Sequence, residues 1–270
     1  MSKLSDQAPK APSSGRDTDA VKSLEKAVSI LECFTTTDRA LSVADIERKS
    51  GLPRSTAHRL AASLRELGFL EQSHERDRYR LGLRLFQIGQ IALTNLDLHR
   101  ESRAALDNLR RITNLPAHVA VFDGRHAIVV QQSSRTSDNY NHLTQLESAP
   151  AYCTSVGKAI LAHQPDEVVE RVISEGLVKF TDSTLAEPDA LRKELREIRR
   201  RGYAVDDGEH QPGIRCVGAP ILERGGIANA AVSVTSSTWD LPTSNIEEIA
   251  KVVIFHAAAI GKSSGLQTDP

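Results

Sequence analysis

Arginine and hydroxyl side chains gather on one short stretch of this sequence, close to residue 56. An arginine can donate two hydrogen bonds to a guanine edge, and short hydroxyl side chains reach phosphate oxygens or base edges. On the same stretch, apolar residues recur at intervals of three and four, which predicts a helix with one face toward a core: Ala57, Leu60, Leu64 and Leu67. We therefore expect the opposite face to contact DNA, with these candidate residues: Arg54, Ser55, Thr56, His58 and Arg59.

A second predicted helix and a tight turn come before this stretch. Ser42 followed by Asp45 has the spacing of a capping box, so a helix is expected to begin after Ser42. Gly51 supplies the backbone freedom that a sharp turn needs. Pro53 is tolerated at the start of the next helix, and Gly68 is a natural stop at its end. Helix, turn and helix in this order are typical of a DNA-binding motif.

Beyond the second helix, the sequence predicts a two-stranded hairpin. A strand begins at Phe69, a polar tip follows, and Tyr79 lies on the returning strand. Arg76 and Arg78 make the tip basic, so the hairpin resembles the wing of a winged helix-turn-helix, and both arginines are candidate DNA contacts. Two alternatives stay open: a small helical domain with a solvated hairpin, or a metabolite-binding sensor whose N-terminal module contacts proteins instead of DNA.

The second half of the chain carries candidates at an expected helix start, Thr154–Ser155. The nearby Gly157–Lys158 pair suggests a phosphate-binding loop. Such a loop needs a glycine where Tyr152 stands and a hydroxyl residue where Ala159 stands, so nucleotide binding of this type is not expected. Free backbone amides and hydroxyls at a helix start favour a small anion such as a carboxylate, and an ordinary helix cap is the alternative.

Cys216 lies near Asp206 and His210 in the sequence, which raises the question of nucleophilic catalysis. Closeness in the sequence is not the spatial relation that a Cys–His pair requires, and no oxyanion site is evident, so we do not expect an enzyme. Ser233 and Thr235 alternate with valines on a predicted strand and therefore share one face. We expect both side chains to line the same cavity as Cys216.

Composition narrows the class of protein further. The 270 residues carry a formal net charge of −1, so the charge of the whole chain does not indicate a polyanion partner. Three cysteines lie far apart, which suits a reducing compartment, and the histidines are scattered, so neither a disulfide framework, a metal site nor a cofactor is expected. No apolar run is long enough to cross a membrane and no signal peptide is evident, so we expect a cytoplasmic protein.

The chain is expected to divide into four segments. Residues 1–17 predict a disordered tail, residues 18–82 the winged helix-turn-helix, and residues 83–96 a linker helix that breaks near Asp97. Residues 97–265 predict a layered α/β domain, which makes the whole chain α+β. Its expected elements are a hairpin turning at Asp123–Gly124, strands at 202–209, 214–222 and 228–237, and helices from 154, at 166–175, 188–201 and 244–262.

From Val21 to Lys262, the sequence resembles the IclR family of bacterial transcriptional regulators. The resemblance is carried by segments that follow one another in the family's order: VKSLEKAVSILECF, GLPRSTAHRL, GFLEQ followed by YRLGLRLFQIG, TSVGKAILA, IRRRGYAVDDGEHQPGIRCVGAPI and AAVSVTSS. Several motifs in one order are more specific than any single pattern.

The resemblance implies a winged helix-turn-helix joined by a linker helix to a GAF-like effector-binding domain. It also implies a homodimer, often paired into a dimer of dimers, that binds double-stranded operator DNA. Such a protein represses or activates a catabolic or metabolic operon in response to a small organic or aromatic acid. The implied effector-pocket positions are Thr154, Ser155, Asp206, Cys216, Ser233 and Thr235. Tyr152–Cys153 replaces the family's more usual histidine and alanine, which alters the pocket rim, so no particular ligand is implied.

Overall fold

The computed structural model describes residues 15–35, 37–73, 77–94, 97–134, 148–264 and 266. Its contacts divide the chain into two compact units, residues 1–92 and 93–270. Most of the predicted tail lies outside the described residues, but from Gly15 onward the chain already belongs to a helix. Among the described helices, none combines the length and the apolar character needed to cross a membrane.

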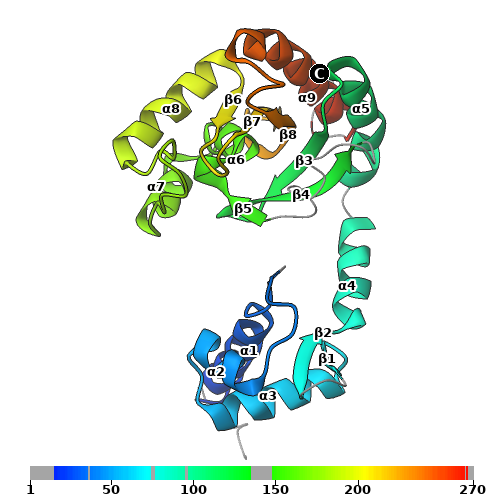
Figure 1. The fold of residues 1–270 in the computed structure, drawn as a ribbon, viewed down its shortest axis with the longest axis vertical. Helices are drawn as coiled ribbons and strands as arrows, with labels where there is room; N and C mark the ends of the chain where they lie inside the picture. Colours follow the sequence, from blue (N-terminus) through cyan, green and yellow to red (C-terminus); the bar gives the residue numbers. More distant parts are fainter. Residues whose placement is uncertain are drawn as a thin grey trace, which may run out of the picture. The chain divides into compact units, whose positions relative to one another are not determined.

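The first unit consists of helices and one hairpin (Figure 1). Its elements are α1 (Gly15–Leu31), α2 (Val43–Ser50), α3 (Arg54–Glu66), β1 (Leu70–Ser73) and β2 (Arg78–Leu81), followed by α4 (Leu83–Thr94). The two strands pair antiparallel, with Leu70 opposite Leu81. Helices and hairpin share one core, which includes Ile30, Ile46, Ala57, Leu64, Leu70 and Tyr79. The predicted helix-turn-helix with its hairpin is thus confirmed.

Local chemistry explains where α2 begins and ends. The Ser42 hydroxyl accepts a hydrogen bond from the Asp45 backbone N–H at 3.2 Å, and the Asp45 carboxylate accepts one from the Ser42 N–H at 3.1 Å. This is the predicted capping box, which satisfies amides that have no partner inside the helix. At the other end, Gly51 adopts φ 67°, a left-handed conformation that a glycine reaches without steric cost.

The buried side of α3 differs from the predicted stripe. Ala57 and Leu64 are buried as expected, but Ala61 is also fully buried, whereas Leu67 is 54% exposed. Because α3 ends at Glu66 and the chain turns at Gly68, Leu67 no longer follows the helical period. Pro53 stands at the N-cap, immediately outside the helix, and its missing N–H is not needed there.

Helix α4 ends at Thr94, and the next helix, α5 (Asp97–Thr113), begins at Asp97, near which the sequence predicts a break. Asp97 begins α5 and places a negative charge in its first turn, where the helix dipole favours one. Residues 95–96, the end of the predicted linker helix, lie outside the described residues. Three apolar side chains of α4 are largely exposed: Leu83, Phe86 and Ile91.

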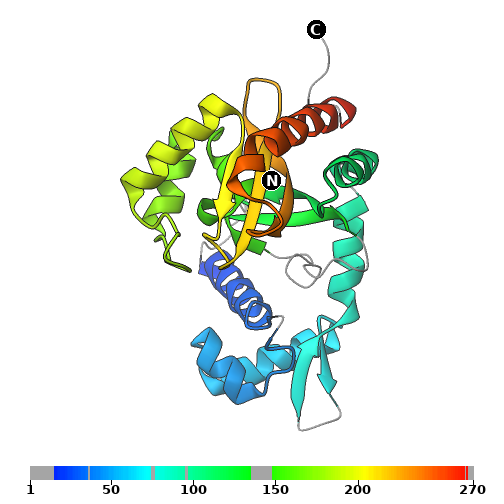
Figure 2. The same cartoon turned by 45° about the horizontal axis from the view of Figure 1, so that its top comes forward.

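The second unit is built on a six-stranded antiparallel sheet with helices on both faces (Figures 1 and 2). The strand order is β5-β4-β3-β8-β7-β6. The strands are β3 (Ala117–Phe122), β4 (His126–Ser133), β5 (Ser148–Pro150), β6 (Ala204–Asp207), β7 (Ile214–Leu222) and β8 (Ala228–Ser237). The helices are α5, α6 (Ser155–Leu161), α7 (Asp166–Ser174), α8 (Pro188–Arg201) and α9 (Ile246–Ser263), with short 3-10 turns η1 (Ala151–Cys153) and η2 (Thr243–Asn245).

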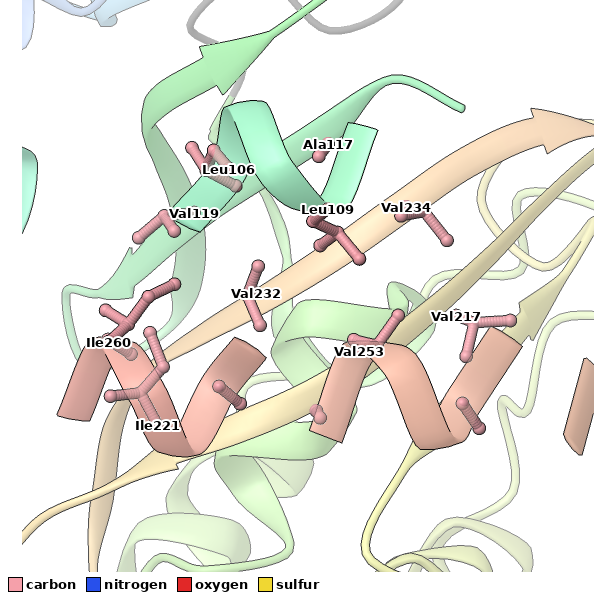
Figure 3. Packing of buried hydrophobic residues seen from close by; sticks show 14 of the residues in the cluster. Leu106, Leu109, Ala117, Val119, Val217, Ile221, Val232, Val234, Val253 and Ile260 are labelled. Atoms are coloured by element: carbon pink, nitrogen blue, oxygen red, sulfur yellow. The ribbon is translucent and has the colours of Figure 1, made fainter. Parts of the chain in front are cut away.

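These elements match the expected hairpin, strands and helices, and add the short strand β5. Helices α5 and α9 cover one face of the sheet. Figure 3 shows how this core is filled by side chains of α5, α9 and the strands, among them Leu106, Leu109, Val253, Ile260, Val232 and Val234. Helix α6 lies against the opposite face, and α7 and α8 pack around it.

Strand alternation decides which side chains reach the second face. In β8, Val232 and Val234 belong to the core under α5 and α9, so Ser233 and Thr235 point to the face that α6 covers. The register places Ser233 opposite His118 of β3, and Thr235 opposite Cys216 of β7. Polar side chains from three adjacent strands therefore meet on one face of the sheet.

Candidate functional site

The candidate DNA-binding face of α3 stands clear of the core of its unit. Arg54, Ser55, His58 and Arg59 are exposed, and Thr56 is half-buried. Within the described part of the chain, Arg54 and Arg59 have no ion-pair partner, so both guanidinium groups are available to a phosphate or a base. The first turns of α3 thus combine positive charge, hydroxyl groups and the free N–H groups of a helix start, which suit DNA contacts.

Of the two hairpin arginines, only Arg78 is among the described residues. Arg76 lies outside the described residues. Arg78 donates a hydrogen bond to the Ala40 carbonyl at 2.8 Å, and its guanidinium lies 3.8 Å from the Asp45 carboxylate. It therefore ties β2 to the start of α2, which occupies part of its hydrogen-bonding capacity. Arg80, which sequence reasoning did not single out, is exposed on the same strand.

The start of α6 is held by a cap and a close backbone approach. The Thr154 hydroxyl accepts a hydrogen bond from the Gly157 N–H at 3.2 Å and donates one to the Pro150 carbonyl at 3.2 Å. A Cβ at Gly157 would lie 2.3 Å from both the Cα and the carbonyl oxygen of Ala151. The glycine of the Gly157–Lys158 pair is therefore required for packing against Ala151.

One cavity, of about 80 Å³, gathers the candidates of the second unit. All six expected residues line it: Thr154, Ser155, Asp206, Cys216, Ser233 and Thr235. The remaining lining residues are His118, Ala127, Val129, Ala149, Val156, His210, Gln211 and Ile214. Most of the surface that lines the cavity is apolar, and several polar side chains converge on it, as in many small-molecule sites.

His118 sits deep in this cavity wall and is neutral. Burial lowers the pKa of its imidazole to about 4. Its Nδ1 lies 3.5 Å from the Thr235 hydroxyl, and among the described residues nothing hydrogen-bonds its buried Nε2. A buried polar atom without a hydrogen-bond partner is costly, so Nε2 is a candidate ligand contact.

Cys216 and Thr235 form a polar contact on neighbouring strands, with 3.2 Å between sulfur and hydroxyl oxygen. Burial raises the pKa of the Cys216 thiol far above its usual range. A thiol that stays protonated is a weak nucleophile, so Cys216 is poorly suited to nucleophilic catalysis. His210, the other member of the pair considered in the sequence, stacks edge-on against Phe180 at 5.2 Å between ring centroids.

Asp206 places a carboxyl group in the cavity wall and is only 4% exposed. Burial raises its pKa to about 6, although Oδ1 accepts hydrogen bonds from the backbone N–H groups of Glu209 at 2.8 Å and His210 at 3.4 Å. Behind this wall, the Lys158 ammonium is buried, pairs with the Glu209 carboxylate and donates to the Val205 carbonyl at 2.7 Å.

Sequence reasoning missed three polar members of the wall, His118, His210 and Gln211. Strand alternation places His118 on the face opposite Val119, but only the pairing of β3 with β8 reveals that this face meets Ser233. His210 and Gln211 lie in the turn between β6 and β7, which no periodic pattern marks. Within the described ranges, no group of three or more His, Cys, Asp or Glu side chains could hold a metal ion.

Comparison with known proteins matches both units to one family. Residues 23–74 match the IclR helix-turn-helix domain, and residues 90–262 match the domain described as bacterial transcriptional regulator IclR C-terminal. The transcriptional repressor IclR of Escherichia coli (strain K12) is 28% identical over 263 residues, which is 94% of this chain and 93% of that protein. The glycerol operon regulatory protein of Streptomyces coelicolor is 32% identical over 220 residues, which is 80% of this chain and 85% of that protein.

Solved structures agree with this match. An IclR homolog from Microbacterium hydrocarbonoxydans, crystallised with 4-hydroxybenzoate, has a TM-score of 0.74 and 26% identity, and the match covers 91% of this chain and all of that chain (100%). The curated relatives are transcription regulators and not enzymes. Family domains that together span most of the chain, with the helix-turn-helix and the polar cavity in their expected places, show that this protein belongs to the IclR family of DNA-binding bacterial transcriptional regulators.

Proposed function

We propose that this regulator controls a catabolic or metabolic operon, as repressor or activator, and that its effector is a small organic or aromatic acid. The observation that carries this proposal is the single cavity lined by all six expected residues. The likeness to a homolog that binds 4-hydroxybenzoate supports an acid of this size. The hydroxyl groups of Ser155 and Ser233, with the unpaired Nε2 of His118, would donate hydrogen bonds to the oxygens of such a ligand. The hydroxyl of Thr154 already donates to the Pro150 carbonyl, and that of Thr235 already contacts Cys216 and His118, so these two would line the site as acceptors.

The exposed face of α3 is the proposed DNA-reading surface. Arg54 and Arg59 would contact base edges or phosphates, and Ser55, Thr56 and His58 would add hydrogen bonds on the same face. Arg78, and with it Arg76 outside the described residues, would contact the backbone beside the reading helix. The charge of the whole chain is near zero, so DNA affinity has to come from this local patch.

The proposed assembly is a homodimer, paired further into a dimer of dimers. Exposed Leu83, Phe86 and Ile91 give α4 an apolar surface that a second copy would cover. Two copies related by a two-fold axis would read the two halves of a near-palindromic operator, which adds the affinity that one modest patch lacks. The proposed place of action is the cytoplasm, where bacterial DNA lies.

Effector and DNA binding would be coupled through the segment 83–96. An effector changes DNA affinity only by the difference between its own affinities for the arrangements that do and do not fit the operator. Some contacts in the cavity therefore have to change with the arrangement of the dimer. Helix α6 and the strands β7 and β8 form walls of the cavity and contact one another. A change in these contacts would pass through the sheet to the helices that pack on its other face.

A gel-shift assay with DNA from upstream of the protein's own gene tests this function. We expect a shift that favours this fragment over random DNA of the same length, and that weakens as salt rises from 50 to about 200 mM. Adding a panel of small carboxylic acids should change the shift at fixed salt. Equal binding to both DNAs, or a shift that no acid alters, contradicts the proposal. A protein that responds to acids but never binds DNA selectively would instead be a sensor that acts through other proteins.

A further inference from the structure

Among the residues that the structure describes, the wall of the effector cavity contains a carboxyl group but no permanent cation. No lysine or arginine is among its lining residues, and the lining groups that ionise are Asp206, His118, His210 and Cys216. Asp206 is 4% exposed, so its charge is poorly screened by water. A carboxylate ligand that enters this cavity therefore meets a like charge, and the described lining residues offer it no fixed counter-charge.

The buried ammonium of Lys158 is already paired with other groups. Lys158 is 1% exposed and does not line the cavity. Its ammonium pairs with the Glu209 carboxylate and donates a hydrogen bond to the Val205 carbonyl at 2.7 Å. It lowers the pKa of Asp206, but burial outweighs this effect. The charge of Lys158 is thus already balanced by Glu209, so it is not available to neutralise the carboxylate of a ligand.

The other ionisable groups around Asp206 do not supply a positive charge either. From β3 and the turn after β6, His118 and His210 face the cavity, and burial lowers the pKa of both imidazoles, so both are neutral above pH 7. From β7 and η1 come the thiols of Cys216 and Cys153, whose pKa burial raises, so both are uncharged. The one ionisable side chain of α6 is Lys158, and β8 contributes only hydroxyl groups to the cavity wall.

The two remaining neighbours are negative or already paired. Asp207 follows Asp206 in β6, alternates to the other face and forms an ion pair with Arg215 at 2.7 Å. Glu209 is the partner of Lys158, and burial raises its pKa while the ammonium opposes that effect. No ionised side chain that faces Asp206 from the described elements is therefore free to neutralise an incoming carboxylate.

The hydrogen bonds of Asp206 leave one oxygen for a ligand. Oδ1 accepts backbone N–H groups from Glu209 and His210, whereas none of the hydrogen bonds within the described ranges uses Oδ2. The buried Nε2 of His118, another lining residue, also has no hydrogen-bond partner within these ranges. When two carboxyl groups share a buried site, one of them is held in the protonated form, because both cannot be charged at short distance in a low dielectric.

We propose that an acid effector enters this cavity together with one proton, which Asp206 and the effector carboxylate share through Oδ2. This inference rests on the proposed function, because it takes the effector to be a carboxylic acid. The proton comes from solvent, so two carboxylates and one proton become one hydrogen-bonded pair with a single negative charge. Intracellular acidity then strengthens effector binding, which makes the response of the regulator dependent on pH.

Calorimetric titration of the full-length protein tests the proton directly. The probes are 4-hydroxybenzoate, benzoate and acetate, whose carboxyl groups are ionised at pH 7 and pH 8. Titration at each pH, in two buffers with different ionisation heats, counts the protons taken up with each acid. We expect uptake of close to one proton per bound acid, and an affinity about tenfold weaker at pH 8 than at pH 7. Binding without uptake and with equal affinity at both pH values overturns the inference.

Two variants assign the proton to Asp206. Asp206→Asn keeps an oxygen acceptor for the two backbone N–H groups but carries no charge, so acids should bind it without proton uptake and with equal affinity at both pH values. The control Asp182→Asn removes an exposed carboxylate from another loop and should behave as wild type. Proton uptake that persists in Asp206→Asn overturns the assignment, and the wild-type titration decides the inference even if this variant does not fold.

The outcomes also separate this inference from the proposed function. If none of the three acids binds either protein at pH 7 or pH 8, and a wider panel of acids leaves the gel shift unchanged, the acid effector itself is wrong. If an acid binds and alters the gel shift but brings no proton, the function stands and only the shared proton is wrong.

Discussion

The buried ammonium of Lys158 pairs with the buried carboxylate of Glu209 and so joins two walls of one cavity. Lys158 belongs to α6, whose start at Thr154 and Ser155 lines the cavity. Glu209 directly precedes His210 in the turn between β6 and β7, which closes another side. Its carbonyl also accepts a hydrogen bond from the Thr184 hydroxyl at 2.6 Å. This ion pair thus links the helix whose start lines the cavity to the turn that closes it.

Removal of the ammonium should be costly. Lys158→Met leaves the Glu209 carboxylate buried without its partner, so the free energy of unfolding should fall by about 3 to 5 kcal/mol. Urea unfolding followed by circular dichroism measures this change. Lys179→Met, which removes an exposed ammonium from its pair with Asp182, should leave the urea midpoint near that of wild type. Adding Glu209→Leu to Lys158→Met should recover most of the loss, and a double variant as unstable as the single one would contradict this account.

A methyl group at Gly157 should disturb the same wall. The added Cβ would lie 2.3 Å from the Ala151 backbone, which has no side-chain freedom to move away. Gly157→Ala should therefore lower the free energy of unfolding by about 1 to 3 kcal/mol, the usual cost of overpacking. In Gly89→Ala the added Cβ meets nothing within 4 Å, and alanine favours a helix, so stability should stay equal or rise. Thermal unfolding of both variants decides whether the close approach matters.

The helix-turn-helix could be predicted almost completely because its signals are local. The capping box of Ser42 and Asp45 and the turn glycine Gly51 each act within a few residues, and all appear in the structure as expected. Periodicity alone was less exact: it placed Leu67 on the buried stripe, whereas the helix has ended by then and Ala61 fills the core. Beyond the end of a helix, the helical period no longer determines which side chains are buried.

The cavity was predicted only in part because its walls are far apart in the sequence. Strand alternation was enough to put Ser233 and Thr235 on one face, and the family resemblance supplied Asp206. His118 could not be assigned, because its role depends on which strand pairs with β3, and that pairing spans more than a hundred residues of chain. The buried Lys158–Glu209 pair was invisible for the same reason: an isolated lysine in a helix gives no sign that it will be buried.

Asp206→Asn should change how stability depends on pH. Burial raises the pKa of Asp206 from 3.8 to about 6. The contribution of protonated Asp206 to the free energy of unfolding is therefore fully present below pH 4 and is lost as the pH rises through 6. The variant has no charge to desolvate, so its free energy of unfolding relative to wild type should improve by about 2 to 3 kcal/mol between pH 4 and pH 8. Urea unfolding at both pH values measures the difference. A constant difference would mean that Asp206 is not desolvated in the folded protein.

Enlarging the side chain at Cys216 should block the cavity. Cys216→Leu adds carbon atoms next to Thr235, whose hydroxyl lies 3.2 Å from the sulfur, so a small acid should no longer fit. DNA binding should persist while the response to the acid disappears in a gel-shift titration. Cys153→Ala removes another buried thiol that does not line the cavity, and it should keep the response. An unchanged titration in Cys216→Leu would take this residue out of the effector site.

Arg59→Ala tests the reading face of α3. The Arg59 side chain is exposed and has no ion-pair partner within the described ranges, so its removal should not disturb the core. If Arg59 contacts a base edge, the variant should lose about 1 to 3 kcal/mol of binding free energy on the DNA that wild type selects, and little on random DNA. Fluorescence anisotropy with both DNAs at one salt concentration measures the two losses. Arg196→Ala removes an exposed arginine from α8 in the other unit and should change neither. Equal losses of Arg59→Ala on both DNAs would identify a phosphate contact instead.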